Sequence, residues 1–190
     1  MLTFRYLIII LLISACAQVG SISGGAKDVM APRIEFCNPS NGQLNAVVEQ
    51  MTIEFDEFVK LQNPAENIIL LPANVDYEYL LKGKTLQIDF QEKLKENTTY
   101  SLYLNGAIKD ITEGNDSLIQ IAFSTGPEID KNQASFIVSD GYSGKPNKNV
   151  LIALYDSLTQ IEPTYFSKSD DQGYSRLRAL KEGTFYTRRD

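Results

Sequence analysis

The chain has 190 residues, enough for one or two domains, and carries 24 acidic against 18 basic side chains, for a net charge of −6. An acidic chain without a basic cluster is poorly suited to nucleic acid, so we expect no nucleic-acid partner. The sequence contains no histidine, which excludes Ser-His-Asp and Cys-His catalysis and histidine-ligated zinc. It also lacks the glycine-rich phosphate-binding motifs. We therefore expect no enzymatic activity and no cofactor.

Residues 1–15 have the order of a secretory signal peptide. Arg5 precedes an apolar run over residues 6–15, and the small residues Ser14 and Ala15 close it. A helix that crosses a bilayer needs about 20 apolar residues, so this run is too short to span one. A charged start, an apolar centre and a small-residue end are typical of a signal peptide. We expect this segment to be helical and to be removed.

Cys16 follows the apolar run directly, in the order Ile13-Ser14-Ala15-Cys16. This order resembles the bacterial lipobox. The resemblance implies that a diacylglycerol is attached to the Cys16 thiol, that the chain is cut before it, and that the new amino terminus is acylated. Two or three acyl chains hold a protein stably on a membrane, whereas one holds it only marginally. The alternative is a plain signal peptide with an incidental cysteine.

Residues 16–31 are expected to form a flexible tether, because residues 17–26 are uncharged and rich in glycine and serine. No aspartate follows Cys16. In the lipoproteins that this motif resembles, that implies sorting to the outer membrane rather than retention in the inner one. The expected location is therefore the cell envelope, with a lipid anchor in the outer membrane. Which face of that membrane carries the protein stays open.

Apolar and polar residues alternate with a period of two through much of residues 32–127. This alternation is typical of antiparallel strands with one solvent-facing side. Turn-forming pairs, including Asn63-Pro64 and Asn105-Gly106, separate the runs at short intervals. The pattern predicts an all-β fold and an Ig-like β-sandwich over residues 32–127. The residues expected to face inward are Met51, Ile53, Phe55, Leu86, Ile88, Phe90, Tyr100, Leu102, Leu104, Ile119, Ile121 and Phe123.

Tyr100 opens one of these strands, a few residues after Leu94. This is the arrangement of a tyrosine corner, in which the phenol bonds to the backbone upstream of the strand. We favour this structural role for Tyr100 over stacking on a ligand.

Several motifs of the same region resemble the SbsA-type bacterial Ig-like domain. A proline-containing first strand is followed by a strand ending in "F-x-E-x-V" and by a closing "Y…D…GN…F-x-T" pattern. The residues that carry this match are Phe55, Glu57, Val59, Tyr100, Asp110, Gly114, Asn115, Phe123 and Thr125. Together with the lipobox, the resemblance implies an envelope lipoprotein of a Gram-negative bacterium.

Residues 132–190 read as a second unit of about five strands. The pattern "G-K-P-x-x-x-V", then "D-x-x-G-Y" and "L-x-x-G-T-F-Y", resembles a carboxypeptidase-regulatory or prealbumin-like domain. The matching residues are Gly144, Lys145, Pro146, Val150, Asp170, Gly173, Tyr174, Leu180, Gly183 and Tyr186. A sandwich of this kind usually has about seven strands. We therefore expect a partial β-sandwich with an open edge and a poorly covered core, in a truncated or frameshifted form of a longer protein.

Two sets of residues raise alternatives to a purely structural reading. Acidic turns could hold calcium, but their spacing does not fit a calcium loop, and such residues also dominate ordinary turns. These turns contain Asp110, Glu113, Asn115, Asp116, Asp170 and Asp171. Four tyrosines could form a sugar-binding face, namely Tyr77, Tyr79, Tyr103 and Tyr165.

Cys37 is expected to be a half-buried side chain rather than a nucleophile, since no histidine exists to activate it.

The favoured hypothesis is a non-catalytic, lipid-anchored envelope protein. Its partners would be the membrane, through the lipid, and an envelope protein bound by Ig-like domains that act as spacers or interaction modules. The alternative is a glycan-binding accessory lipoprotein. No metal site is expected under either hypothesis.

Overall fold

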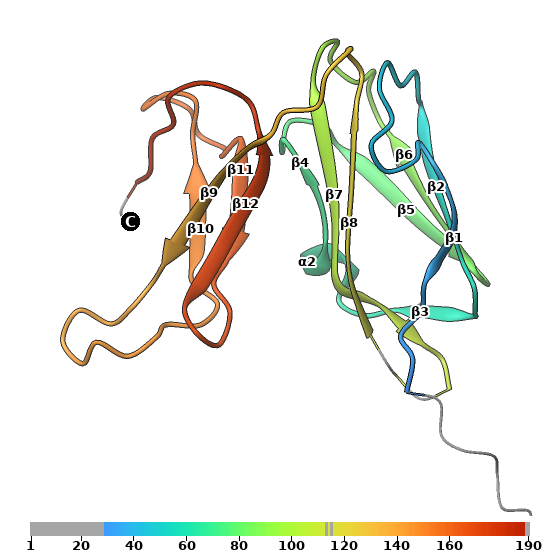
Figure 1. Cartoon of the computed structure of the whole chain (residues 1–190), viewed down its shortest axis with the longest axis horizontal. Helices are drawn as coiled ribbons and strands as arrows, with labels where there is room; N and C mark the ends of the chain where they lie inside the picture. The colour runs from blue at the N-terminus through green and yellow to red at the C-terminus, as the bar shows by residue number, and fades with distance from the viewer. Residues whose placement is uncertain (1–28, 113, 115, 189–190) are drawn as a thin grey trace, which may run out of the picture.

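The computed structural model describes residues 29–112, 114 and 116–188 (Figure 1). The expected signal peptide, Cys16 and nearly all of the tether lie outside these residues. Strands dominate the described part, and its one α-helix, α2 (Pro64–Asn67), has four residues. The prediction of an all-β fold with an Ig-like sandwich is confirmed.

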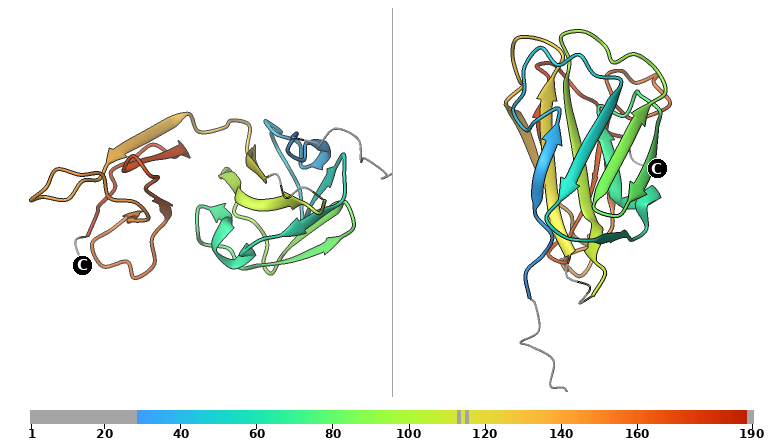
Figure 2. Two further views of the ribbon diagram at one scale, coloured as in Figure 1. Left: turned by 90° about the horizontal axis from the view of Figure 1, so that it is seen from below. Right: turned by 90° about the vertical axis from the view of Figure 1, so that its right-hand side faces the viewer.

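The first eight strands form two antiparallel sheets that pack face to face (Figure 2). One sheet has the order β1-β2-β6-β5 and consists of β1 (Ile34–Asn38), β2 (Gln50–Phe55), β6 (Thr85–Phe90) and β5 (Tyr77–Lys82). In the other sheet the long strand β7 pairs with all three of its partners. Its strands are β3 (Val59–Leu61), β4 (Ile68–Leu71), β7 (Thr99–Asp110) and β8 (Asp116–Ser124).

The core of this sandwich contains the side chains that the two-residue period selects. Met51, Ile53 and Phe55 of β2 are fully buried. Tyr100, Leu102 and Leu104 of β7 meet them from the opposite sheet. Burying such side chains contributes about 1.5–3 kcal/mol each, which is the main driving force for closing the two sheets.

Asn105-Gly106 does not end a strand, contrary to the expectation from sequence. β7 continues through it to Asp110, and the pairing register with β8 shifts between Asn105 and Lys109. Gly106 has φ +69°, a conformation that glycine adopts in bulges as readily as in turns. The pair therefore bends a long strand instead of reversing the chain.

The second unit contains four strands in two two-stranded sheets, whereas the sequence predicted about five strands. β9 (Asn132–Ile137) pairs with β12 (Tyr174–Leu180), and β10 (Leu151–Leu154) pairs with β11 (Tyr165–Lys168). The fifth strand expected near Tyr186 is reduced to a single bridge with Tyr155. Residues 181–188 are otherwise mostly exposed, apart from Phe185, whose ring packs edge-on against Tyr165.

The second unit packs against the outer face of β4 and β7 (Figure 1). Leu71 of β4 lies in one buried cluster with Leu177 of β12 and Tyr165 of β11. The backbone N–H of Ala73 donates to the Thr164 carbonyl oxygen across the junction (2.8 Å). The poorly covered core expected for this unit is therefore covered in part by the first domain.

Candidate functional site

The expected lipid attachment site, Cys16, lies outside the described residues, so its lipidation stays a prediction. Within residues 29–112, 114 and 116–188, no helix is long and apolar enough to cross a membrane. The described chain enters the sandwich at the end opposite the β6–β7 loop, as the strand directions of β1 and β7 show (Figure 1).

Tyr100 lies at the start of β7 with its side chain fully buried. Its phenol oxygen accepts a hydrogen bond from the backbone N–H of Lys95, five residues upstream (2.9 Å). Burial raises the pKa of Tyr100, and the Lys95 hydrogen bond partly opposes this. This is the geometry expected of a tyrosine corner. How much it stabilises the domain stays a prediction.

Thr125 and Phe123 complete the surroundings of Tyr100. The Thr125 hydroxyl donates to the Lys95 carbonyl oxygen (2.6 Å) and accepts from the Thr98 N–H (3.0 Å). The Phe123 ring stacks on the Tyr100 ring, with centroids 5.7 Å apart. The closing "Y…F-x-T" residues thus hold the β6–β7 loop in place, so their role is to build the fold.

Cys37 is partly buried on β1, and its thiol donates to the Pro39 carbonyl oxygen (3.0 Å). Burial raises the pKa of the thiol to about 11. Since the thiolate is the nucleophilic form, a thiol with this pKa is inert near neutral pH.

Two of the acidic turn residues, Asp170 and Asp110, accept hydrogen bonds from backbone N–H groups. The Asp170 carboxylate accepts from the N–H groups of Gln172 and Tyr174 (2.9 Å each). Asp110 is buried, and its carboxylate accepts from the Thr112 N–H (2.6 Å). No group of three or more potential metal-binding side chains occurs within the described residues. The backbone hydrogen bonds of Asp170 and Asp110 are those of turn residues.

The four tyrosines considered for sugar binding do not share a face. Tyr77 and Tyr79 lie on β5, and the Tyr77 phenol donates to the Ile68 carbonyl oxygen (2.7 Å). Tyr103 lies on the opposite sheet, and Tyr165 is buried in the cluster between the two units. Tyr103 borders an open groove.

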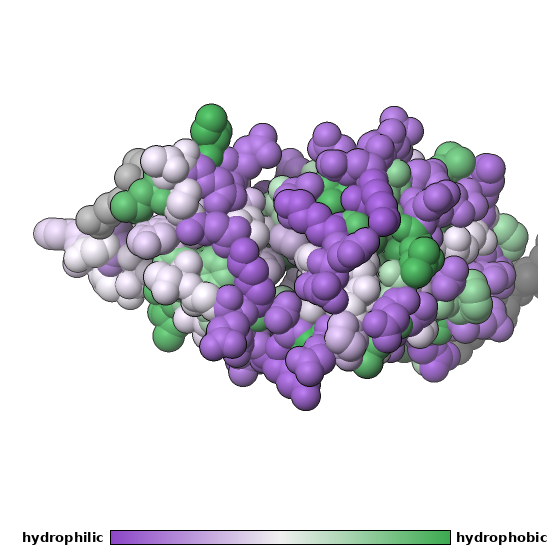
Figure 3. Space-filling model, turned by 90° about the horizontal axis from the view of Figure 1, so that it is seen from above, coloured by the Kyte–Doolittle hydropathy of each residue, from purple (hydrophilic) through white to green (hydrophobic). Residues whose placement is uncertain are grey.

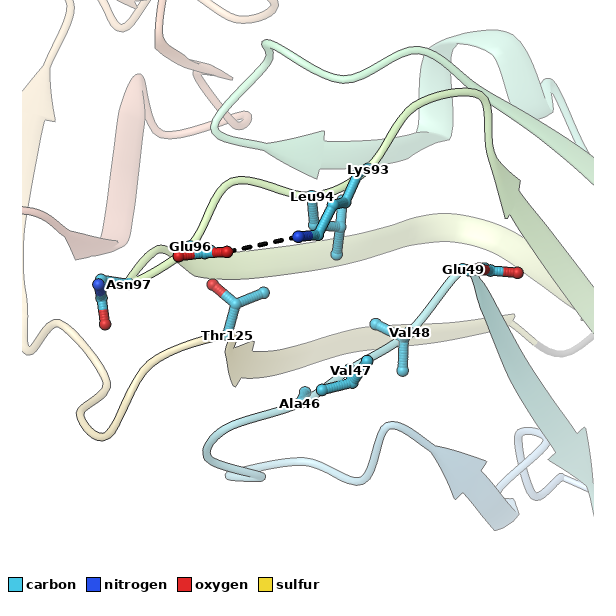
Figure 4. Close-up of a pocket in the computed structure, with 9 residues that line it drawn as sticks. All are labelled: Ala46, Val47, Val48, Glu49, Lys93, Leu94, Glu96, Asn97 and Thr125. Carbon is cyan, nitrogen blue, oxygen red and sulfur yellow. Dashed lines mark hydrogen bonds and ion pairs between the residues drawn. The ribbon is translucent and has the colours of Figure 1, made fainter.

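A pocket of about 340 Å³ opens at the loop end of the first domain (Figure 4). Val47 in its wall is almost fully exposed, and Lys93 and Glu96 form an exposed ion pair (3.3 Å) beside it. The residues that line it are Ala46, Val47, Val48, Glu49, Lys93, Leu94, Glu96, Asn97 and Thr125. The face of the molecule seen from this end is mostly hydrophilic, with scattered hydrophobic side chains (Figure 3). Loops at the end of a sandwich are common binding surfaces, because the sheets position them while their sequences are free to vary.

A second hollow lies between the two units, where β12 faces β7 and β8. It has a volume of about 380 Å³ and includes Arg176 and Arg178 of β12. The sequence pattern offered one signal for it: the two arginines alternate with buried residues, so they point to the same side of the strand.

The two packed antiparallel sheets define an immunoglobulin-like β-sandwich. The chain belongs to the bacterial Ig-like domain family, whose model matches residues 28–125. Membership in this family confirms the Ig-like part of the resemblance found in the sequence. It indicates a structural or interaction module of an extracellular or envelope protein.

Solved structures similar to the chain include the N-terminal part of the bacterial S-layer protein SbsC. The identity is 15% and the TM-score 0.36, over 81% of this chain and 33% of that one. An L,D-transpeptidase from Mycobacterium smegmatis has 13% identity and a TM-score of 0.35, over 83% of this chain and 80% of that one. The chain thus spans about a third of the S-layer structure. Similarities this distant carry no argument about activity. No curated protein matches the chain.

Proposed function

We propose that the protein is a non-catalytic lipoprotein of the bacterial cell envelope, anchored in the outer membrane through lipid on Cys16. The observation that carries the proposal is the Ile13-Ser14-Ala15-Cys16 order behind a short apolar run, followed by an uncharged tether and an Ig-like domain. The tether separates Cys16 from β1, which begins at Ile34. That length lets the domain stand clear of the lipid headgroups.

In this proposal the Ig-like domain serves as a spacer or protein-interaction module. The chain enters the domain at one end, and the pocket beside Val47 and Leu94 opens at the other. An anchored molecule would therefore present its loop end away from the membrane. Exposed Val47 beside the Lys93–Glu96 pair combines apolar and charged contacts, as protein-binding surfaces do.

We further propose that β9–β12 is a partial carboxypeptidase-regulatory-like unit. Its support is local: the Gly144 and Gly173 turns that carry the sequence resemblance both require positive φ, at +67° and +70°. This unit would extend the spacer and present further surface.

The anchor is tested by membrane fractionation of a Gram-negative host that expresses the full chain. Cys16→Ala should move the protein from the membrane to the soluble fraction and abolish incorporation of labelled fatty acid. Cys37→Ala is the matched control, because it removes the chain's other cysteine and should change neither result. An unlabelled parent, with Cys16→Ala still in the membrane fraction, would contradict the proposal.

A further inference from the structure

The groove between the two units has a wall from each of them. β7 and β8 contribute one side, and β12 contributes the other. At about 380 Å³ it lies at the small end of the range for ligand sites. The residues that line it are Tyr103, Asn105, Ile119, Gln120, Tyr174, Arg176 and Arg178.

The charge in the groove is of one sign. Arg176 and Arg178 are both exposed, on the same side of β12. Among the described residues, no acidic side chain lines the groove, and neither guanidinium forms an ion pair with a carboxylate. Two guanidinium groups that no carboxylate neutralises, in an otherwise acidic protein, create a local site for an anion. Each guanidinium can bind a carboxylate through two parallel hydrogen bonds.

Arg176 is held in position before any ligand binds. Its guanidinium lies over the Tyr174 ring, 5.4 Å from the centroid. Its Nε donates to the Ser135 hydroxyl (3.4 Å), which in turn contacts the Tyr174 hydroxyl (3.2 Å). A guanidinium that already has its orientation loses less freedom when it binds.

The opposite wall is polar but uncharged. The Gln120 amide donates to the Tyr103 phenol oxygen (3.0 Å), and Asn105 is exposed beside them. Amide and phenol groups donate and accept hydrogen bonds at once, as sugar hydroxyls do. Ile119 adds a small apolar contact.

We propose that this groove binds a short acidic saccharide, with its carboxylate on Arg176 and Arg178 and its hydroxyls on the Tyr103–Gln120–Asn105 wall. The neutral hydrogen-bonding wall beside the arginine pair can bind the hydroxyl groups of a saccharide. An acidic peptide would need only the positive charge of the arginines, so the wall favours a saccharide. The site goes beyond the proposed envelope role and does not depend on the lipid anchor. It also differs from the expected tyrosine face, with which it shares only Tyr103.

The test is to titrate the full chain with trigalacturonate in mild detergent. Calorimetry measures the affinity, and NMR of the side-chain amides shows where the ligand binds. Neutral maltotriose and hexaglutamate are the comparison ligands. Trigalacturonate should bind, shift the Gln120 and Asn105 amide signals, and weaken as salt rises. Maltotriose and hexaglutamate should each bind at least about tenfold more weakly.

Arg176→Gln and Arg178→Gln should each weaken trigalacturonate binding about tenfold or more, since a charge-assisted hydrogen bond is lost. Arg33→Gln is the control, because Arg33 is an exposed arginine paired with Asp56 on the first domain (3.4 Å). Far-UV circular dichroism verifies that each variant is folded. Absent binding, equal binding of hexaglutamate, or full binding by the Arg176→Gln/Arg178→Gln double variant would overturn the proposal.

Discussion

Replacing Tyr100 with phenylalanine removes one oxygen atom and leaves the ring in place. That oxygen is the acceptor for the Lys95 N–H at 2.9 Å, in a partly buried position. A buried donor left without its partner costs about 1–3 kcal/mol. The ring contact with Phe123 survives in the variant, so this cost comes from the hydrogen bond alone.

The assay is urea unfolding of the full chain followed by far-UV circular dichroism. For a domain of this size the free energy of unfolding falls by about 1–3 kcal/mol for each molar of urea. A loss of 1–3 kcal/mol therefore moves the midpoint by about 0.3–3 M, with about 1 M for a loss of about 2 kcal/mol at a dependence of about 2 kcal/mol per molar. The matched control is Tyr142→Phe, because Tyr142 is fully exposed and its change should stay within about 0.5 kcal/mol. An unchanged midpoint for Tyr100→Phe would refute a stabilising role for the corner.

Three further predictions follow from burial and backbone geometry. Gly173→Ala should destabilise the second unit strongly, because a Cβ there would collide with the Val138 carbonyl oxygen. Gly144 has the same positive φ but open space around it, so Gly144→Ala should lower the free energy of unfolding by only about 1–2 kcal/mol, as measured by thermal unfolding. A fragment of residues 29–127 should unfold cooperatively, whereas residues 132–190 alone should not, because part of their core is covered by the first domain; a cooperative transition in the second fragment would contradict this. Burial raises the pKa of Tyr77, Tyr100, Tyr103 and Tyr165, so the folded protein holds these phenol protons more tightly than the unfolded chain does. The free energy of unfolding should therefore be unchanged below about pH 10 and should fall as the pH rises above it, as measured by denaturation midpoints between pH 8 and 11.

The sequence predicted those parts of the fold that depend on local alternation. Each inward-facing residue of β2 is buried, because a period of two assigns side chains to faces without knowledge of the partner strand. Tyr100 could be singled out for a similar reason, since its hydrogen-bond partner lies only five residues away. Asn105-Gly106 could not be assigned, because a glycine with positive φ serves a turn and a bulge equally well.

The contact between the two units was not predicted, although β4 held a signal for it. All four residues of β4, Ile68–Leu71, are apolar. Such a run is expected of a strand that is covered on both faces. Ile68 and Leu70 face the first core, while Ile69 and Leu71 face the second unit. The groove was missed for a related reason, because its two walls lie far apart in the sequence and meet only when the units pack.

The central claim is that lipid on Cys16 anchors an Ig-like domain in the envelope. Mass spectrometry of the amino-terminal peptide, from protein extracted from the membranes of a Gram-negative host, tests it most directly. We predict a peptide that begins at Cys16 and carries the mass of a diacylglycerol and an additional acyl chain. A peptide that retains residues before Cys16, or that begins at or after Cys16 without added lipid mass, would contradict the claim.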